Sequence, residues 1–135
     1  MTVVAGKREE GDLRVLTVSG GLCDYTLRIV SNEKNFPKRY RWCVSNRILQ
    51  ITLDIDDRLI LANSVLVREG DGSRERRAAY QTEALELTYV LLRHIDRAYR
   101  MFGIGSVSVE RWTRQITDLQ RLIRGWRRKD LDRYG

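Results

Sequence analysis

Residues 109–126 read VERWTRQITDLQRLIRGW, and their apolar side chains recur every three or four positions. In an α-helix of 3.6 residues per turn, this spacing places them on one face. The residues of that face are Val109, Trp112, Ile116, Leu119, Ile123 and Trp126. Charged and polar residues occupy the positions between them, so the segment is predicted to be a helix with one buried side and one solvated side.

Three further segments, all nearer the N-terminus, show the same period. Their apolar faces are Val15, Val18, Leu22, Thr26 and Ile29 in the first, Val44, Ile48, Ile51, Ile55, Leu59, Ala62 and Leu66 in the second, and Leu85, Leu92, Ile95, Tyr99 and Phe102 in the third. Short turn sequences, SNEKNFP at 31–37, EGDGS at 69–73 and GIG at 103–105, separate the segments. Four helices with three short connections predict an all-α protein, an antiparallel up-down-up-down four-helix bundle.

The boundaries of the helices are predicted from capping residues. The helices are expected to begin near Asp12, Pro37, Ser73 and Ser108, and the second and third to end near Arg68 and Phe102. Val107 is expected to pack on Trp112 as a hydrophobic staple. A chain of 135 residues favours one domain. We therefore expect a flexible N-terminal tail at 1–11, the bundle at 12–129 and a frayed C-terminal tail at 130–135.

The sequence carries no mark of export or membrane insertion. It contains no run of about 20 apolar residues and no charged start followed by an apolar segment. Cys23 and Cys43 lack the spacing of a metal or redox motif and are interpreted as small buried residues. Whether the two thiols meet is left open. A cytoplasmic protein that does not contact membranes is the expectation.

No set of catalytic groups is apparent. His94 is the single histidine, which excludes a pair of histidine metal ligands. Asp54 and Asp57 share a helix face, but Arg58 is adjacent, and ion pairing explains these charges more simply. No glycine-rich loop has the spacing of a phosphate-binding motif. We therefore expect a protein that is not an enzyme and that acts by binding, without a cofactor or a metal.

The basic residues are the most informative feature. The formal net charge is +7, and 21 of the 25 basic residues are arginine. Arginine offers a planar set of donors that fits phosphate, so this excess favours a polyanionic partner. Alternatively, the bases form solvated faces and complement helix dipoles. The candidate nucleic-acid-binding residues are Lys38, Arg39, Arg41, Arg47, Arg74, Arg76, Arg77, Arg93, Arg97, Arg100, Arg121, Arg124, Arg127 and Arg128.

The predicted topology gathers these bases into two zones. The start of the second helix should lie beside the end of the third, and the end of the fourth beside the start of the third. A more acidic waist with Asp54, Asp57, Glu83 and Glu86 should separate the zones. Neutralisation of phosphates by such zones would release counterions and bind RNA or DNA at low salt.

Two aromatic residues, Tyr40 and Trp42, alternate with bases in the run KRYRW at 38–42. Such alternation is typical of sites that stack unpaired bases, but packing in the core or against another subunit is an equal alternative. Apolar residues outside the main faces, namely Leu49, Ile60, Leu61 and Leu122, indicate a homo-oligomer.

Several runs resemble those of a known family. They are FPKRYRW at 36–42 followed by Arg47-Ile48, Ala62-Asn63, and RLIRGW at 121–126. They are similar to the accessory variability determinant of diversity-generating retroelements, a four-helix-bundle family shared with proteins encoded in intervening sequences of bacterial 23S ribosomal RNA genes. The resemblance extends from about Asp12 to Lys129. The sequence departs from the family at Ser45-Asn46, where Gly-Glu is frequent, and at Arg127-Arg128.

The resemblance implies a basic homopentamer that binds a reverse transcriptase and nucleic acid and is needed for mutagenic cDNA synthesis, without catalysis of its own. It matches Arg41 and Arg47 to recurrent basic positions. It matches Phe36, Pro37, Gly125 and Trp126 to structural positions. An adaptor that binds only proteins, or an intervening-sequence-type bundle of unassigned activity, is the alternative.

Overall fold

The computed structural model describes the backbone of residues 7–134 and the side chains of residues 14–134. The elements in chain order are the helix α1 (Lys7–Ser31), the 3₁₀-helix η1 (Lys38–Tyr40), the π-helix η2 (Arg41–Ser45), and the helices α2 (Asn46–Ser64), α3 (Ser73–Phe102) and α4 (Ser106–Tyr134). No strand occurs in this part of the chain. The predicted all-α fold is therefore confirmed.

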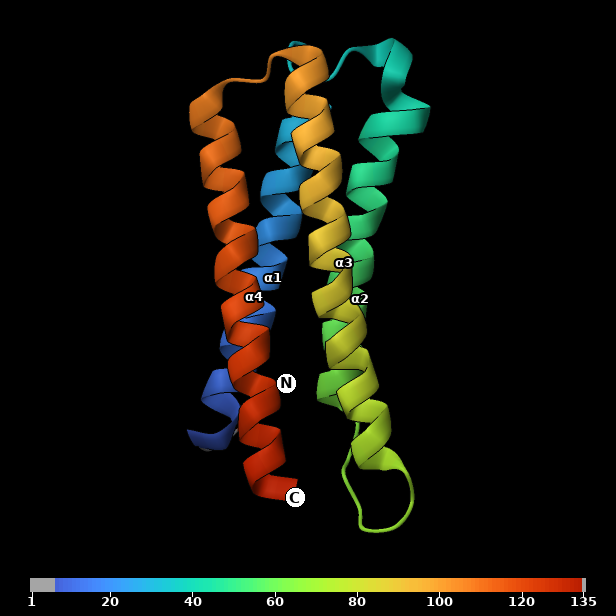
Figure 1. Cartoon of the computed structure of the whole chain (residues 1–135), viewed down its shortest axis with the longest axis vertical. Coiled ribbons are helices and arrows are strands. Elements are labelled where there is room, and N and C mark those ends of the chain that lie inside the picture. The colour runs from blue at the N-terminus through green and yellow to red at the C-terminus, as the bar shows by residue number, and fades with distance from the viewer. Residues whose placement is uncertain (1–6, 135) are drawn as a thin grey trace.

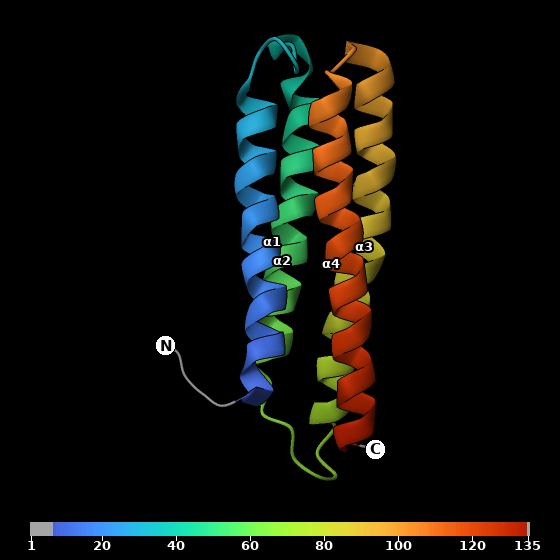
Figure 2. The ribbon, with the colours of Figure 1, turned by 90° about the vertical axis from the view of Figure 1, so that its left-hand side faces the viewer.

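The four long helices alternate in direction and form a closed ring of neighbours. Each helix packs on the one before it, and α1 closes the ring against α4 (Figures 1 and 2). One end of the bundle carries η1, η2 and the α3–α4 connection, and we call it the η end. The other end carries the α2–α3 loop and the last turns of α4, and we call it the loop end. Among the described residues, no helix combines the length and the apolar character that a membrane span requires.

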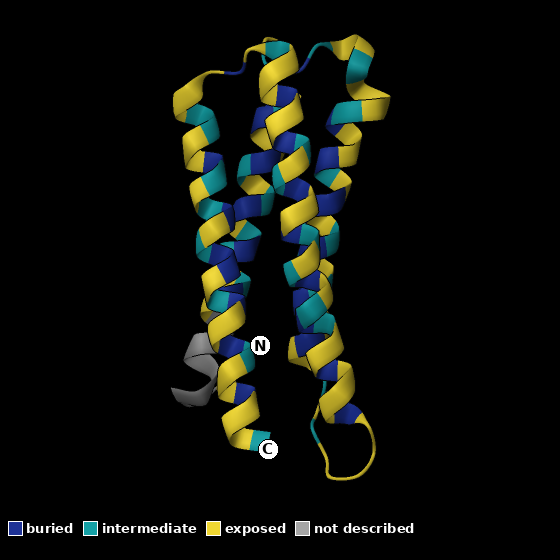
Figure 3. Ribbon diagram, in the orientation of Figure 1, coloured by how far each residue is buried: buried dark blue, intermediate teal, exposed yellow. Residues whose placement is uncertain are grey.

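The core runs along the inner faces of the helices (Figure 3). The predicted face of α4 is confirmed from Trp112 to Trp126, all of whose apolar members are buried, while Val109 is half-buried. The predicted faces of α1 and α2 also form the core, except that Leu66 is exposed. Buried apolar surface is the main stabilising contribution to a bundle of this kind.

The inner face of α3 differs from the prediction. Its buried residues are Ser73, Arg77, Gln81, Ala84, Thr88, Leu91, Ile95 and Ala98. Tyr99 is exposed, whereas Leu85, Leu92 and Phe102 are only half-buried. The apolar pattern misled the prediction because two polar residues on the inner face find buried partners: Gln120 Nε2 donates to Thr88 Oγ1 at 2.9 Å, and Gln81 binds Asp130.

The second predicted helix is three elements in the structure. Lys38–Tyr40 is a 3₁₀ turn, Arg41–Ser45 is a π turn, and α2 ends at Ser64 rather than near Arg68. Val65 is extended, with φ −74° and ψ 121°. The end is stabilised by tertiary contact, because the carbonyl of Ala62, which accepts the Val65 N–H at 3.3 Å, also accepts a hydrogen bond from Arg77 Nη1 at 3.2 Å. No local sequence pattern contains that contact.

The helix starts also differ from the capping predictions. The N–H of Ser73 donates to Asp71 Oδ1 at 2.9 Å, while the Ser73 hydroxyl bonds to the backbone of Arg68. The N-cap of α3 is therefore Gly72, at φ 81°, and the Asp71 carboxylate one residue before it accepts the first N–H of the helix. α4 begins at Ser106, two residues before the predicted cap, and Val107 is 74% exposed, so it forms no staple.

Both predicted tails are shorter than expected. α1 begins at Lys7, so residues 7–11 are helical, which fits the helix-forming run KREE at 7–10. The remainder of that tail, residues 1–6, lies outside the described residues. At the other end α4 continues to Tyr134 because Asp130 is buried and bound by α3. A buried ion pair therefore holds the last turns, where a frayed tail was predicted.

A buried hydrogen bond joins α4 to α1 and gives a test of the packing. Trp112 Nε1 donates to Thr26 Oγ1 at 2.9 Å, and both residues are fully buried. Substitution of Thr26 by valine should lower the free energy of unfolding by about 1–3 kcal/mol, because the indole N–H loses its acceptor. Urea denaturation measures the change. The same substitution at exposed Thr117 should alter stability by less than about 0.5 kcal/mol. Equal effects of the two would contradict the assigned contact.

Candidate nucleic-acid interface

The η end is fixed to the bundle by an aromatic cluster. Phe36 is buried, with its ring centroid 5.6 Å from that of Phe102 and 6.2 Å from that of Trp112. The Tyr40 ring lies 5.2 Å from Phe102. These contacts join the start of the second helical segment to the end of α3, as the alternating topology predicts. Of the two alternatives for Tyr40, stacking on a nucleobase or packing in the core, the structure thus shows packing.

Exposed bases surround this aromatic anchor. Lys38, Arg39 and Arg41 belong to η1 and η2 and are exposed, and Arg47 follows in the first turn of α2. No acidic residue occurs between Lys34 and Leu53. The rigid anchor holds these side chains on a fixed backbone, so their positive charges are presented together to solvent.

Arg47 and Arg97 also converge across two helices. Both act on His94, whose pKa lies below its ordinary value of 6.5, first because the ring is partly buried and then because of the positive charges of Arg97 and Arg47. The two positive charges that converge here favour an anion, whereas the partial burial of the ring disfavours any charge. Arg93 and Arg100 are exposed on the same half of α3, and Arg100 forms a surface ion pair with Asp96 at 3.1 Å, which contributes little to stability.

At the loop end, the prediction for Arg77 is wrong. Arg77 is only 5% exposed, and its Nε and Nη2 bind the Asp130 carboxylate at 2.6 and 3.2 Å. Gln81 Nε2 donates to the same carboxylate at 2.9 Å, and the guanidinium lies over the Trp126 ring at 4.9 Å. Arg77 is therefore a structural residue that joins α3 to α4.

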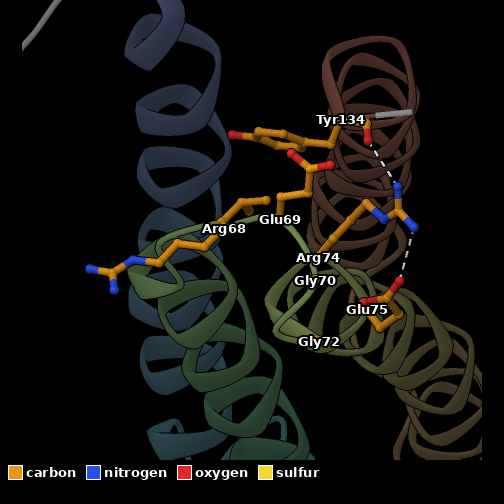
Figure 4. A pocket seen from close by; sticks show the side chains of 8 residues that line it. Arg68, Glu69, Gly70, Gly72, Arg74, Glu75 and Tyr134 are labelled. Atoms are coloured by element: carbon orange, nitrogen blue, oxygen red, sulfur yellow. Dashed lines mark hydrogen bonds and ion pairs between the residues drawn. The ribbon is translucent and has the colours of Figure 1, made fainter.

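Other bases at the loop end are mixed with acids. Arg74 bridges the carbonyl of Tyr134 and the carboxylate of Glu75, and Figure 4 shows it between them beside a hollow of about 630 Å³. Arg68 and Glu69 line the same hollow, which thus presents both signs of charge. Such a lining gives an anion no clear advantage.

The remaining predicted bases lie on α3 and α4. Arg121 pairs with Asp118 one turn earlier, and Arg124 binds the Tyr89 hydroxyl and lies 5.9 Å from its ring. Arg76 and Arg128 are exposed, and Arg127 is half-buried. The topology brings the two predicted zones to opposite ends. The stretch 119–129 on α4 is also free of acids, but Arg121 and Arg124 in it are bound to neighbouring side chains. The exposed bases at 38–47, in contrast, form no ion pair with the described residues.

Acidic side chains in the middle of the bundle bind polar neighbours. Arg58 on α2 and Glu83 on α3 form an ion pair at 3.4 Å, and Asp56 accepts a hydrogen bond from Ser19 at 2.7 Å. Asp54 accepts one from Gln50. The ion pairing predicted for Asp54 and Asp57 is not found among the described residues, because the adjacent Arg58 pairs with Glu83 across the helix interface instead. Within the described range, no group of three His, Cys, Asp or Glu side chains could hold a metal ion.

The two cysteines have different surroundings and separate partners. Burial, followed by the charges of Asp56, Asp24 and Asp57, raises the pKa of Cys23 to about 12, so its thiol stays protonated near neutral pH. Cys43 is exposed, contrary to the prediction, because the π turn directs it outward. Both are free thiols, which excludes a disulfide between them in this structure.

The exposure of Trp42 has no signal in the local sequence pattern. Its side chain is 86% exposed, whereas Tyr40 two residues earlier packs on Phe102. No family model, curated protein or solved structure matches the chain.

Proposed function

We propose that this chain is a non-catalytic nucleic-acid-binding protein that holds the phosphate backbone at its η end. The observation that carries the proposal is the acid-free group of exposed bases on η1, η2 and the start of α2, fixed by the aromatic anchor. Its members are Lys38, Arg39, Arg41 and Arg47. Arg93, Arg97 and Arg100 of α3 lie at the same end, where Arg100 pairs with Asp96.

Phosphate is the ligand that best fits this group. Arginine binds phosphate through paired donors, and a rigid set of such donors loses little entropy on binding. Each neutralised phosphate also releases condensed counterions, so the affinity should fall steeply with salt. A protein of net charge +7 adds long-range attraction for any polyanion.

The partner protein and the assembly follow from the resemblance noted above. We propose that the chain serves as an accessory subunit of a retroelement reverse transcriptase in mutagenic cDNA synthesis, as an oligomer in the cytoplasm. Exposed Leu53, Ile60, Leu61 and Val90 on α2 and α3 support an apolar contact between copies. Co-purification of an affinity-tagged chain with the reverse transcriptase tests the first part, and sedimentation the second.

Fluorescence anisotropy of a labelled structured RNA, titrated with the protein, tests nucleic-acid binding directly. We expect the labelled RNA to bind tightly at low salt. Polyglutamate of equal charge should displace this RNA poorly, because carboxylates on a flexible chain match the arginine donors less well than phosphates do. Displacement by polyglutamate as effective as by unlabelled RNA, or no RNA binding at low salt, would contradict the proposal. The protein would then be an adaptor for acidic proteins.

His94 makes the proposed binding dependent on pH. Its pKa lies below 6.5 in the free protein because of burial and the charges of Arg97 and Arg47. A phosphate bound by these arginines would raise that pKa, so binding takes up a proton and the affinity rises as the pH falls below neutrality. The association constant should rise by about tenfold at low pH for each unit by which the bound phosphate raises the pKa of His94.

Anisotropy titrations from pH 8 to about pH 5 measure this dependence. In the variant His94→Gln the affinity should vary less over the same range, while the affinity at pH 8 stays close to that of the native chain. An identical pH profile in the two proteins would show that phosphate does not approach His94.

A further inference from the structure

Trp42 is the most exposed large hydrophobic residue that the structure describes, with 86% of its surface accessible. It lies in the π turn η2, between exposed Arg41 and exposed Cys43. The inward positions of the same segment are taken by Tyr40, by half-buried Val44 and by buried Ser45. The segment is thus anchored on one side, and Trp42 projects from the other.

The face of the indole is available to a ligand. In the described part of the chain, no aromatic ring and no cation contacts Trp42. In contrast, the Arg77 guanidinium lies over Trp126, and Trp112 makes edge-on contacts with Tyr25 and Phe36. A tryptophan in the core buries a large apolar area, so a ring this exposed contributes little to folding. A role for Trp42 in binding must therefore be inferred from the residues around it.

Those surroundings are cationic. Lys38, Arg39, Arg41 and Arg47 lie within five residues of Trp42, with no acid in the same stretch. An aromatic ring beside a group of phosphate-binding bases is the arrangement by which proteins hold single strands, because the bases bind the backbone and the ring stacks on a nucleobase. A second copy of the chain would bring like positive charge against this surface and would offer no nucleobase for the indole to stack on.

From this arrangement we infer that Trp42 stacks on an unpaired nucleobase, so that the η end prefers single-stranded segments of RNA or DNA. The inference rests on the proposed function and adds the class of ligand. In a duplex the faces of the bases are already stacked on one another, and access to the indole requires that they be unstacked first. The arginines bind the phosphates of single strands and of duplexes alike, so Trp42 accounts for the preference for single strands.

The test compares three labelled probes by anisotropy: a short unstructured strand, the same strand with abasic sites at its centre, and its blunt duplex. The variants are Trp42→Ala, Trp42→Phe and, as a control, Val107→Ala, which removes another exposed apolar side chain at the same end. Because Trp42 and Val107 are largely exposed, all three variants should fold, and circular dichroism verifies this.

The expected result is specific to the probe. Trp42→Ala should weaken binding of the normal strand by about 5- to 100-fold, the range of one base–aromatic stack. It should leave binding of the abasic strand and the duplex within about twofold of the native chain, and Trp42→Phe should retain most of the affinity. Val107→Ala should leave the affinity for all three probes unchanged. Quenching of the exposed indole fluorescence by the normal strand, but not by the abasic strand, should accompany the binding.

Two outcomes would overturn the inference while the proposed function stands. One is equal weakening of all three probes by Trp42→Ala, and the other is unchanged binding of the normal strand. A change of sedimentation coefficient in Trp42→Ala without change in strand affinity would place a second copy of the chain on Trp42 and would also overturn it. Failure of the native chain to bind any probe would instead contradict the proposed function itself.

Discussion

Substitution of Asp130 by alanine is expected to lower the free energy of unfolding by about 3–5 kcal/mol. The carboxylate accepts two hydrogen bonds from Arg77, at 2.6 and 3.2 Å, and one from Gln81 at 2.9 Å. Arg77 is 5% exposed, so its charge would remain buried with its main acceptor removed. The loss of a single partner of a buried pair is much more costly than the loss of the whole pair.

Urea denaturation followed by circular dichroism measures this effect. Asp132→Ala is the matched control, because Asp132 is exposed two residues further along α4, and its removal should change stability by less than about 0.5 kcal/mol. The double variant Arg77→Met, Asp130→Leu should recover part of the lost stability, since it leaves no unpaired charge buried, although the Gln81 amide still lacks its acceptor. If Asp130→Ala and Asp132→Ala unfold at the same urea concentration, the Arg77–Asp130 ion pair does not stabilise the end of α4.

The second large effect concerns nucleic-acid binding at the η end. Simultaneous substitution of Arg41 and Arg47 by glutamate should lower the affinity for a structured RNA by at least about 100-fold. Each change removes a charge-assisted contact to phosphate and introduces a repulsive carboxylate. Both side chains are exposed, so the fold should not change.

The control for this variant makes the same change of charge at the opposite end. Arg76 and Arg128 are exposed at the loop end, on α3 and α4, and their replacement by glutamate should lower the affinity far less. Any general effect of net charge is common to both variants, and the difference between them therefore reports the η end. Equal losses would show that the protein binds RNA through diffuse charge rather than through a localised interface.

The regular parts of the fold were predictable because they depend on local periodicity. The apolar spacing of α4 identified its buried face from Trp112 to Trp126, and short connections between helices were enough to predict the alternating topology. The irregular parts depend on contacts between distant residues. The end of α2 at Ser64 is stabilised by Arg77, and the end of α4 by the same residue through Asp130.

The candidate site was predicted in composition but not in detail. The sequence identified the bases, and the topology placed the start of the second segment beside the end of α3, where Tyr40 contacts Phe102. It could not separate Arg77 from its exposed neighbours, because the partner Asp130 lies 53 positions away. It also could not distinguish Tyr40 from Trp42, since the π turn that directs one ring inward and the other outward has no local sequence signature.

If phosphates bind at the η end, the salt dependence of the RNA affinity should change when the bases of that end are replaced. The logarithm of the association constant should fall linearly with the logarithm of the salt concentration, because counterions are released. The slope for the Arg41→Glu, Arg47→Glu variant should be shallower than that of the native chain by roughly one to two units, as two phosphate contacts are lost. Equal slopes for the two proteins would place the phosphate contacts elsewhere and contradict the assignment of the η end.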